Sequence, residues 1–124
     1  MSSKVGQWSG AVFLLTALLA GETAAHAVMV KATPAEDSVL ANSPAVVSVW
    51  FNEPLEAAFS SLTVSDARTR VVVKGALEAI ADNGLSLPLD AALPAGTYTV
   101  RYRVLSVDGH IVEDQFRFVI DAAR

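Results

Sequence analysis

Residues 93–110 read LPAGTYTVRYRVLSVDGH, and this stretch decides the fold class. A turn signal at residues 93–96 is followed by residues 97–104, in which apolar and polar side chains alternate. A period of two is typical of a β-strand that has one buried face and one face in water. The side chains predicted to face the core are Tyr98, Val100, Tyr102 and Val104.

Further β patterns lie on both sides of this strand. After a loop at residues 108–110, a last strand is predicted with an inward set of Phe116, Phe118 and Ile120. The other predicted strands cover residues 28–32, 45–52, 59–65, 85–89 and 115–120, and residues 71–80 form either a strand or an irregular edge. Asn83-Gly84 is a tight-turn signal, and Pro88 favours an edge strand. We therefore expect about seven strands, no helix after residue 26, and an all-β Greek-key sandwich of the immunoglobulin-like type.

The first 25 residues have the features of an export signal. Lys4 supplies a positive charge, residues 11–20 (AVFLLTALLA) are uncharged and apolar, and small residues occupy positions 23–25. The apolar run is too short to span a bilayer, which needs about 20 residues. The sequence therefore predicts a cleaved signal peptide over residues 1–25. One domain over residues 26–124 would then reach the periplasm without membrane insertion.

The predicted mature chain is acidic and has no cysteine. Removing Lys4 and Glu22 with the signal leaves a net charge of −4 on the remaining 99 residues. An acidic domain without a basic cluster argues against nucleic acid or an anionic membrane surface as a partner. Because no disulfide or thiolate is available, an apolar core must stabilise the fold. Any metal must then bind through nitrogen, oxygen or thioether ligands.

Four polar residues are candidate metal ligands. His26 directly follows the predicted cleavage point, and His110, the second of two histidines, lies in the loop between two patterned strands. Asp108 precedes His110 by two positions, so in an extended segment both side chains point to the same side. Gly109 between them permits close approach or a positive φ. Glu53, at the end of the predicted strand 45–52, could add a ligand or orient one.

A histidine at a free N-terminus is a chelating ligand. Cleavage after Ala25 or after Ala27 satisfies the small-residue rule, and only the first leaves His26 at the terminus. Its α-amine and imidazole Nδ1 could then close a six-membered ring on one metal ion, with the imidazole of His110 bound across from them. Three nitrogens in a tetragonal plane suit Cu(II). The residue types alone also fit an interpretation without a metal, in which residues 108–110 form a simple turn and the candidate side chains are only solvated.

Several motifs of the mature chain occur together. They are His26-Ala27, KATPAEDSVLANSP at 31–44, WFNEPLE at 50–56, the 93–110 stretch, and FRFVI at 116–120. This combination resembles the CopC family of periplasmic copper-binding proteins, which includes PcoC-like domains, over essentially the whole mature chain. The 93–110 stretch is the most specific part, because the turn, the alternating strand and the Asp-x-His spacing occur together.

The resemblance implies a fold, a metal and a partner. It implies a β-sandwich that binds one Cu(II) ion, with the family's ligands falling on His26, Asp108 and His110. The family's strand-end glutamate falls on Glu53, which is either a ligand or an outer group that orients one. The implied role is a copper carrier or scavenger in copper homeostasis or resistance. Such a carrier exchanges copper with an inner-membrane transporter, which would be CopD-like.

Two departures from the family pattern affect these expectations. Some CopC proteins bind Cu(I) through a methionine-rich segment, but Met29 is the single methionine after residue 26, as in Cu(II)-only members. Many relatives follow the ligand histidine with Pro-Val-Ser-Gly, whereas this chain has Ile-Val-Glu-Asp at 111–114. The second departure leaves the ligands intact. It affects what can be expected of the shape of the loop next to His110 and of the partner that docks there.

Two other functions must be separated from the carrier. A small copper oxidase or monooxygenase could use the same N-terminal chelate. However, 99 residues with one tryptophan, Trp50, offer little surface for a polysaccharide substrate. A fourth ligand such as Asp108 also favours holding copper over opening it to oxygen. An immunoglobulin-like domain without metal would make the positions of both histidines coincidental. We therefore expect a carrier and not an enzyme.

Overall fold

The computed structural model describes residues 26–73 and 75–123, so the predicted export signal at residues 1–25 lies outside the described part. Within that part, the regular elements are strands and one short 3-10 turn, η2 (Ala57–Phe59). No helix there is long and apolar enough to cross a membrane. The strands are β1 (Met29–Thr33), β2 (Val39–Leu40), β3 (Val46–Phe51), β4 (Ser61–Ser65), β5 (Glu78–Ile80), β6 (Gly84–Pro88), β7 (Gly96–Leu105) and β8 (Ile111–Ile120).

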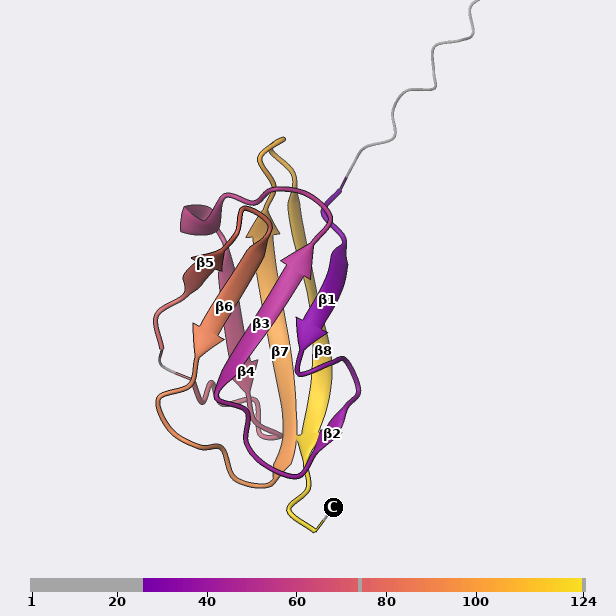
Figure 1. The fold of residues 1–124 in the computed structure, drawn as a ribbon, viewed down its shortest axis with the longest axis vertical. Coiled ribbons are helices and arrows are strands. Elements are labelled where there is room, and N and C mark those ends of the chain that lie inside the picture. The colour runs from indigo at the N-terminus through magenta and orange to yellow at the C-terminus, as the bar shows by residue number, and fades with distance from the viewer. Residues whose placement is uncertain (1–25, 74, 124) are drawn as a thin grey trace, which may run out of the picture.

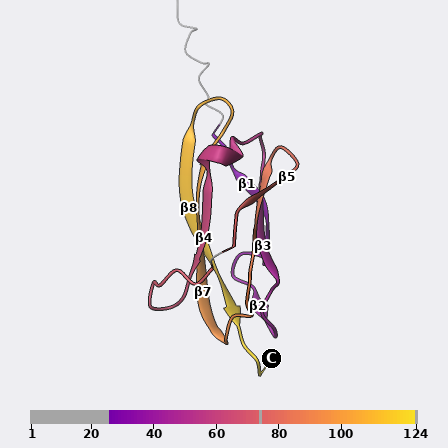
Figure 2. The ribbon, with the colours of Figure 1, turned by 90° about the vertical axis from the view of Figure 1, so that its left-hand side faces the viewer.

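The strands form two four-stranded sheets that face each other (Figure 1). One sheet has the order β1-β3-β6-β5 and the other has the order β2-β8-β7-β4. Every neighbouring pair is antiparallel except β2 and β8, which run parallel. Figure 2 shows the two layers nearly edge-on. The predicted all-β sandwich is confirmed, with β2 as a short strand that the sequence patterns did not indicate.

The core lies between the sheets and is built from alternate residues of the strands. The four β7 side chains predicted to face inward are at most 6% exposed, and the three predicted on β8 are at most 4% exposed. Phe51 of β3 enters from the other sheet, with its ring edge-on to Tyr102 at a centroid distance of 5.1 Å. Burying one such side chain stabilises the fold by about 1.5–3 kcal/mol. The core therefore fixes β7 and β8, and with them the loop that joins these strands.

The Asn83-Gly84 pair does not form the turn in the way the sequence predicted. The turn occupies residues 81–83, and Gly84 is the first residue of β6. A Cβ atom at Gly84 would lie 2.8 Å from Cδ1 of Trp50 and 2.9 Å from the carbonyl oxygen of Ile80. The glycine is therefore needed for close packing of the neighbouring strands, because both contacts are shorter than a side chain tolerates.

Two strand predictions need correction. The edge position predicted for the strand containing Pro88 is wrong, because β6 lies between β3 and β5. Proline is tolerated there because β5 pairs only with residues 84–86, so Pro88 lies beyond its end. The last strand begins at Ile111 rather than at Gln115, because its backbone pairs with β7 from Ile111 onward. The stretch 71–80 contains a strand only at its end, as β5.

One end of the sandwich gathers the segments that carry the candidate ligands. β7 ends and β8 begins there, joined by residues 106–110 (Figure 1). β3 also ends there, and Phe51 pairs with Met29 at the start of β1. The first described residues, 26–28, therefore lie beside the end of β3. This topology brings together segments that are more than 80 positions apart in the sequence.

Candidate metal centre

The loop at residues 106–110 is closed by its own hydrogen bonds. The backbone N–H of Ser106 donates to the carbonyl oxygen of His110 at 2.9 Å. The backbone N–H of Gly109 donates to the carbonyl oxygen of Ser106, also at 2.9 Å. Gly109 has a φ of +94°, which side-chain-bearing residues rarely adopt. The predicted role of this glycine is confirmed. The tight turn holds the side chains of Asp108 and His110 close together.

The carboxylate of Asp108 accepts hydrogen bonds from a residue before it and a residue after it in the loop. Its Oδ1 atom accepts a hydrogen bond from the Ser106 hydroxyl and one from the backbone N–H of His110 at 3.3 Å. The same oxygen lies 3.2 Å from Nδ1 of His110. The hydrogen bond from Ser106 lowers the pKa of the Asp108 carboxyl below its ordinary value, and the contacts with His110 lower it further. The carboxylate therefore stays ionised and able to bind a cation over a wide pH range.

His26 is placed by its neighbours in the sequence. Ala27 is 3% exposed and belongs to the apolar core. Val28 and Asn52 are joined by two hydrogen bonds: the N–H of Val28 donates to Oδ1 of Asn52 at 2.8 Å, and the N–H of Asn52 donates to the carbonyl oxygen of Val28 at 3.0 Å. These contacts fix the chain on the end of β3. His26 itself remains exposed beside the 106–110 loop.

The two imidazole rings lie edge to face at this end. The ring centroids of His26 and His110 are 5.0 Å apart, and the ring planes meet at 76°. Because a metal–imidazole bond is about 2.0–2.1 Å long, one ion can bridge rings at this spacing after small rotations. The side chains of His110 and Asp108 are 46% and 37% exposed, so a metal ion can reach them from solvent.

Glu53 lies near these residues but is not joined to them. The next residue, Pro54, accepts a hydrogen bond from the N–H of Val107 at 3.1 Å, and Leu55 forms a bridge with Ser106. The backbone around Glu53 therefore runs along the candidate loop. Among the described residues, no ion pair or hydrogen bond connects its half-buried carboxylate to Asp108 or to a histidine. Its side chain would have to turn toward a bound ion to act as a ligand.

The donor atoms fit a borderline metal ion, although they are not preassembled into a cage. In residues 26–73 and 75–123, no three His, Asp or Glu side chains form a group close enough to hold a metal. The structure instead shows linked pairs, His26 with His110 and His110 with Asp108. Two imidazoles and one carboxylate suit Zn or Cu(II) better than a hard cation such as Mg²⁺. A further donor from the same end would complete such a site.

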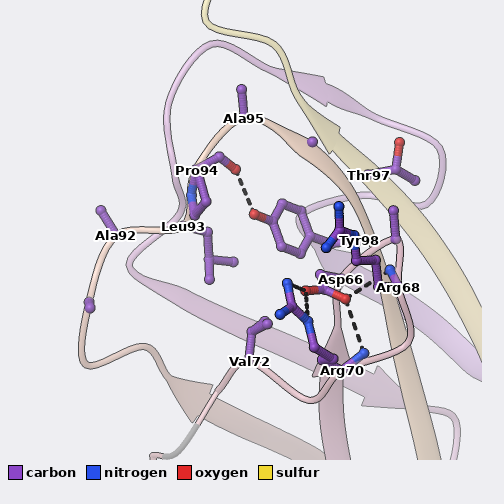
Figure 3. Close-up of a pocket in the computed structure, with 13 residues that line it drawn as sticks. Asp66, Arg68, Arg70, Val72, Ala92, Leu93, Pro94, Ala95, Thr97 and Tyr98 are labelled. Carbon is purple, nitrogen blue, oxygen red and sulfur yellow. Dashed lines mark hydrogen bonds and ion pairs between the residues drawn. The ribbon is translucent and has the colours of Figure 1, made fainter.

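A separate groove lies at the opposite end of the sandwich, where β4 ends and β7 begins (Figure 3). It contains none of the candidate ligands. Two of its charged groups, Asp66 and Arg70, are paired with each other: Asp66 accepts a hydrogen bond from Nε of Arg70 at 3.0 Å and another from the backbone N–H of Arg68 at 2.9 Å. The hydroxyl of Tyr98 donates to the carbonyl oxygen of Pro94 at 2.6 Å. These internal contacts stabilise the loops and leave the His26 end as the candidate site.

The chain matches a known protein family. The family model described as "CopC domain" matches residues 29–121, which is most of the chain. The chain belongs to the CopC family. The resemblance inferred from the sequence motifs is thereby confirmed, and the matched range contains β1 to β8 and three of the four candidate ligands.

Two proteins are similar to this chain in sequence, and the chain covers very different shares of them. The copper transport protein CutJ of Bacillus subtilis (strain 168) is 32% identical over 122 residues, which are 97% of this chain and 23% of CutJ. This CopC-family chain therefore spans about a quarter of CutJ. Protein YobA of Escherichia coli (strain K12) is 28% identical over 109 residues, which are 86% of this chain and 88% of YobA.

Solved structures of the family have the same sandwich. CopC from Methylosinus trichosporium OB3b aligns with a TM-score of 0.72 and 37% identity, covering 77% of this chain and 94% of that chain. PcoC, a methionine-rich copper resistance protein from Escherichia coli, aligns with a TM-score of 0.70 and 26% identity, covering 78% of this chain and all of PcoC. This CopC-family chain thus shares its fold with CopC and with a protein described as a copper resistance protein.

Sequence reasoning missed two residues that shape the site. Asn52 ties the start of the chain to β3, and Ser106 holds the Asp108 carboxylate. Asn52 lies in the Phe-Asn-Glu segment next to Glu53, where a polar residue at a strand end was the available signal. Ser106 ends the alternating strand and has no signal of its own, because a serine at that position resembles any loop residue.

Proposed function

We propose that residues 26–124 bind one Cu(II) ion in the periplasm and act as a copper carrier or scavenger in copper homeostasis or resistance. The observation that carries this proposal is the pair of exposed imidazoles, His26 and His110, held 5.0 Å apart beside Asp108 in a CopC-family chain. Copper is the cargo of such a protein. The names of the relatives CutJ, a copper transport protein, and PcoC, a copper resistance protein, support this choice of metal.

The proposed chelate requires removal of residues 1–25. In the full chain the nitrogen of His26 is part of a peptide bond to Ala25, so it is an amide and not an amine ligand. Cleavage after Ala25 creates an α-amine, which can bind copper together with Nδ1 of the same residue. The imidazole of His110 provides the third nitrogen. Asp108 adds an oxygen ligand, and Glu53 acts as a ligand or orients one.

A carrier fits the domain better than an enzyme does. The candidate ligands lie at one end of a small sandwich, on loops and on the first described residues, and none of them lines the groove at the opposite end. A copper oxidase using the same nitrogens would instead need a surface that binds an organic substrate. Consumption of hydrogen peroxide or reductant by the copper-loaded protein, compared with free Cu(II), separates the two. A carrier suppresses this chemistry below the level of free copper.

The proposed partner is an inner-membrane, CopD-like copper transporter. This chain matches less than a quarter of CutJ, so in that copper transport protein the homologous segment is joined to a much longer chain. A separate carrier would form the corresponding contact without a covalent link. The rim at 111–114 lies directly beside His110, and a docked partner would therefore meet this segment next to the metal.

We expect Cu(II) to be held far more tightly than Cu(I). Met29 is the single methionine of residues 26–124, and it is partly buried against the core, so a soft multidentate thioether site is not available. Competition with chelators specific for each oxidation state, in air and under a reductant, measures the two affinities. Preferential retention of Cu(I), or a second tight site, would contradict the Cu(II) assignment.

A further inference from the structure

Asn52 is an exposed residue that connects the end of β3 to the first described residues. β3 ends at Phe51, and the chain bends directly after it. Oδ1 of Asn52 accepts a hydrogen bond from the N–H of Val28 at 2.8 Å, and the N–H of Asn52 donates to the carbonyl oxygen of Val28 at 3.0 Å. Asn52 therefore extends the pairing of β1 with β3 by one residue beyond Met29, where β1 begins.

The end of β3 is itself fixed from the neighbouring strand. The N–H of Phe51 donates to the carbonyl oxygen of Asn83 at 2.9 Å, and Nδ2 of Asn83 donates to the carbonyl oxygen of Phe51 at 2.8 Å. The side chain of Phe51 is fully buried in the core. Asn52 is thus attached to a well-packed part of the sandwich, although the residue itself is exposed. Its hydrogen bond to Val28 therefore has a fixed origin.

The contacts of Val28 limit where His26 can go. Ala27, which is 3% exposed, is the single residue between Val28 and His26. Because consecutive Cα atoms are 3.8 Å apart, the Cα atom of His26 lies within about 7.6 Å of that of Val28. The first residues of a domain are poorly ordered unless they are tied down. Here they are tied down, and the ring of His26 lies 5.0 Å from that of His110.

Holding two ligands of one metal ion together raises the affinity without adding a contact. The second ligand then binds as if it were present at a high local concentration. The entropy of ordering the chain has also been lost before the ion arrives. His26 and His110 are more than 80 positions apart in the sequence, so the fold alone brings them together. The hydrogen bonds that attach the first residues to β3 should therefore contribute to metal affinity.

We propose that Asn52 is a positioning residue for the copper site. By holding the N–H of Val28, its side chain presents His26 to the same ion as His110. Asn52 does not touch the metal itself. Its amide oxygen must face Val28, because the amide nitrogen cannot accept a hydrogen bond from an N–H group. The inference rests on the proposed function, since a positioning role for copper requires that both histidines bind the ion.

The first test compares Asn52→Ala with Asn42→Ala. Asn42 is an exposed asparagine between β2 and β3, at the end of the sandwich opposite the histidines (Figure 1). We expect Asn52→Ala to weaken Cu(II) binding by about 10-fold, the lower end of the range for groups that orient a metal ligand. Asn42→Ala should leave the affinity unchanged. Asn52→Asp keeps an acceptor oxygen for Val28 and should retain at least the wild-type affinity.

The same substitution in a His110→Ala background separates positioning from a general loss of structure. Without the second ring, His26 has no partner with which it must be aligned. Asn52→Ala should then cost less than about 2-fold in Cu(II) affinity, which is the scatter expected for independent sites. Competition titrations of the four proteins with a Cu(II) chelator measure the coupling. An equal loss in both backgrounds, or no loss when His110 is present, would overturn the inference.

A further readout does not depend on copper. In the metal-free protein beginning at His26, nuclear Overhauser contacts should join the ring protons of His26 and His110, because the ring centroids are 5.0 Å apart. Asn42→Ala should keep these contacts, and Asn52→Ala should lose them while its circular dichroism is unchanged. Their persistence in Asn52→Ala would contradict the inference. Failure of the wild type to bind Cu(II) would instead refute the proposed function, and the NMR comparison would still decide whether Asn52 holds His26 beside His110.

Discussion

A protein whose His26 α-amine is acetylated is expected to lose tight Cu(II) binding, whereas the protein with a free amine on His26 retains it. Acetylation converts the α-amine into an amide and leaves no other terminal amine, so the chelate ring is lost while the imidazoles and Asp108 are unchanged. We expect the affinity to fall by more than about 100-fold, because loss of a direct ligand should exceed the loss caused by an orienting group. Competition titrations with a Cu(II) chelator at neutral pH measure the difference.

The pH dependence provides the control for this comparison. An α-amine has a reference pKa of about 7.7–8.0, and it must lose its proton before it binds a metal. The affinity of the protein with a free His26 amine should therefore decrease as the pH falls below neutrality, and acid should release the copper. If both proteins hold Cu(II) equally well between about pH 5 and 8, the N-terminal chelate is not the site.

His110→Ala is expected to have the largest effect of any single loop substitution. It removes one of two imidazoles, and with it the ring that faces His26 at 5.0 Å. We expect a loss of more than about 100-fold in Cu(II) affinity, because a direct nitrogen ligand disappears. Asp108→Ala leaves all three nitrogens and should cost about 10–100-fold. Glu53→Ala should cost least, because no described contact joins Glu53 to the other three.

The stability of these variants separates a binding defect from a folding defect. The side chains of His110 and Asp108 are substantially exposed and lie outside the core, so their removal should change the melting temperature of the metal-free protein little. Thermal unfolding followed by circular dichroism, together with the same chelator titrations, gives both quantities. A ranking in which Glu53→Ala is the most damaging would show that the ligands are misassigned.

The fold was predictable where side-chain alternation and strand pairing coincide. β7 has both, so its inward residues were identified correctly. In β8 the alternation holds from Phe116 onward but fails before it, because Glu113 and Asp114 are both exposed. The strand nevertheless continues there, since its backbone pairs with β7 and the ion pair between Arg103 and Glu113 joins the two strands at 3.1 Å. Such pairing depends on the neighbouring strand and cannot be read from a local pattern.

The site was predictable only in part, for a similar reason. The spacing of Asp108 and His110 identified the loop, although the two side chains meet through a tight turn at Gly109 and not through the extended segment that the spacing argument assumed. The meeting of His26 with His110 depends on the topology that brings the start of β1 beside the end of β3. The family resemblance supplied that expectation, whereas no spacing rule could. Ser106 could not be found at all, because its importance lies in a hydrogen bond formed only after the loop closes.

The copper content of the protein beginning at His26 tests the central claim most directly. The protein is equilibrated overnight with excess Cu(II), desalted to remove loosely bound metal, and analysed for copper and protein by mass spectrometry and amino-acid analysis. The account predicts a ratio of one copper per chain that survives desalting at neutral pH. A ratio near zero would contradict the proposal that this CopC-family chain carries Cu(II), whatever the geometry of its histidines.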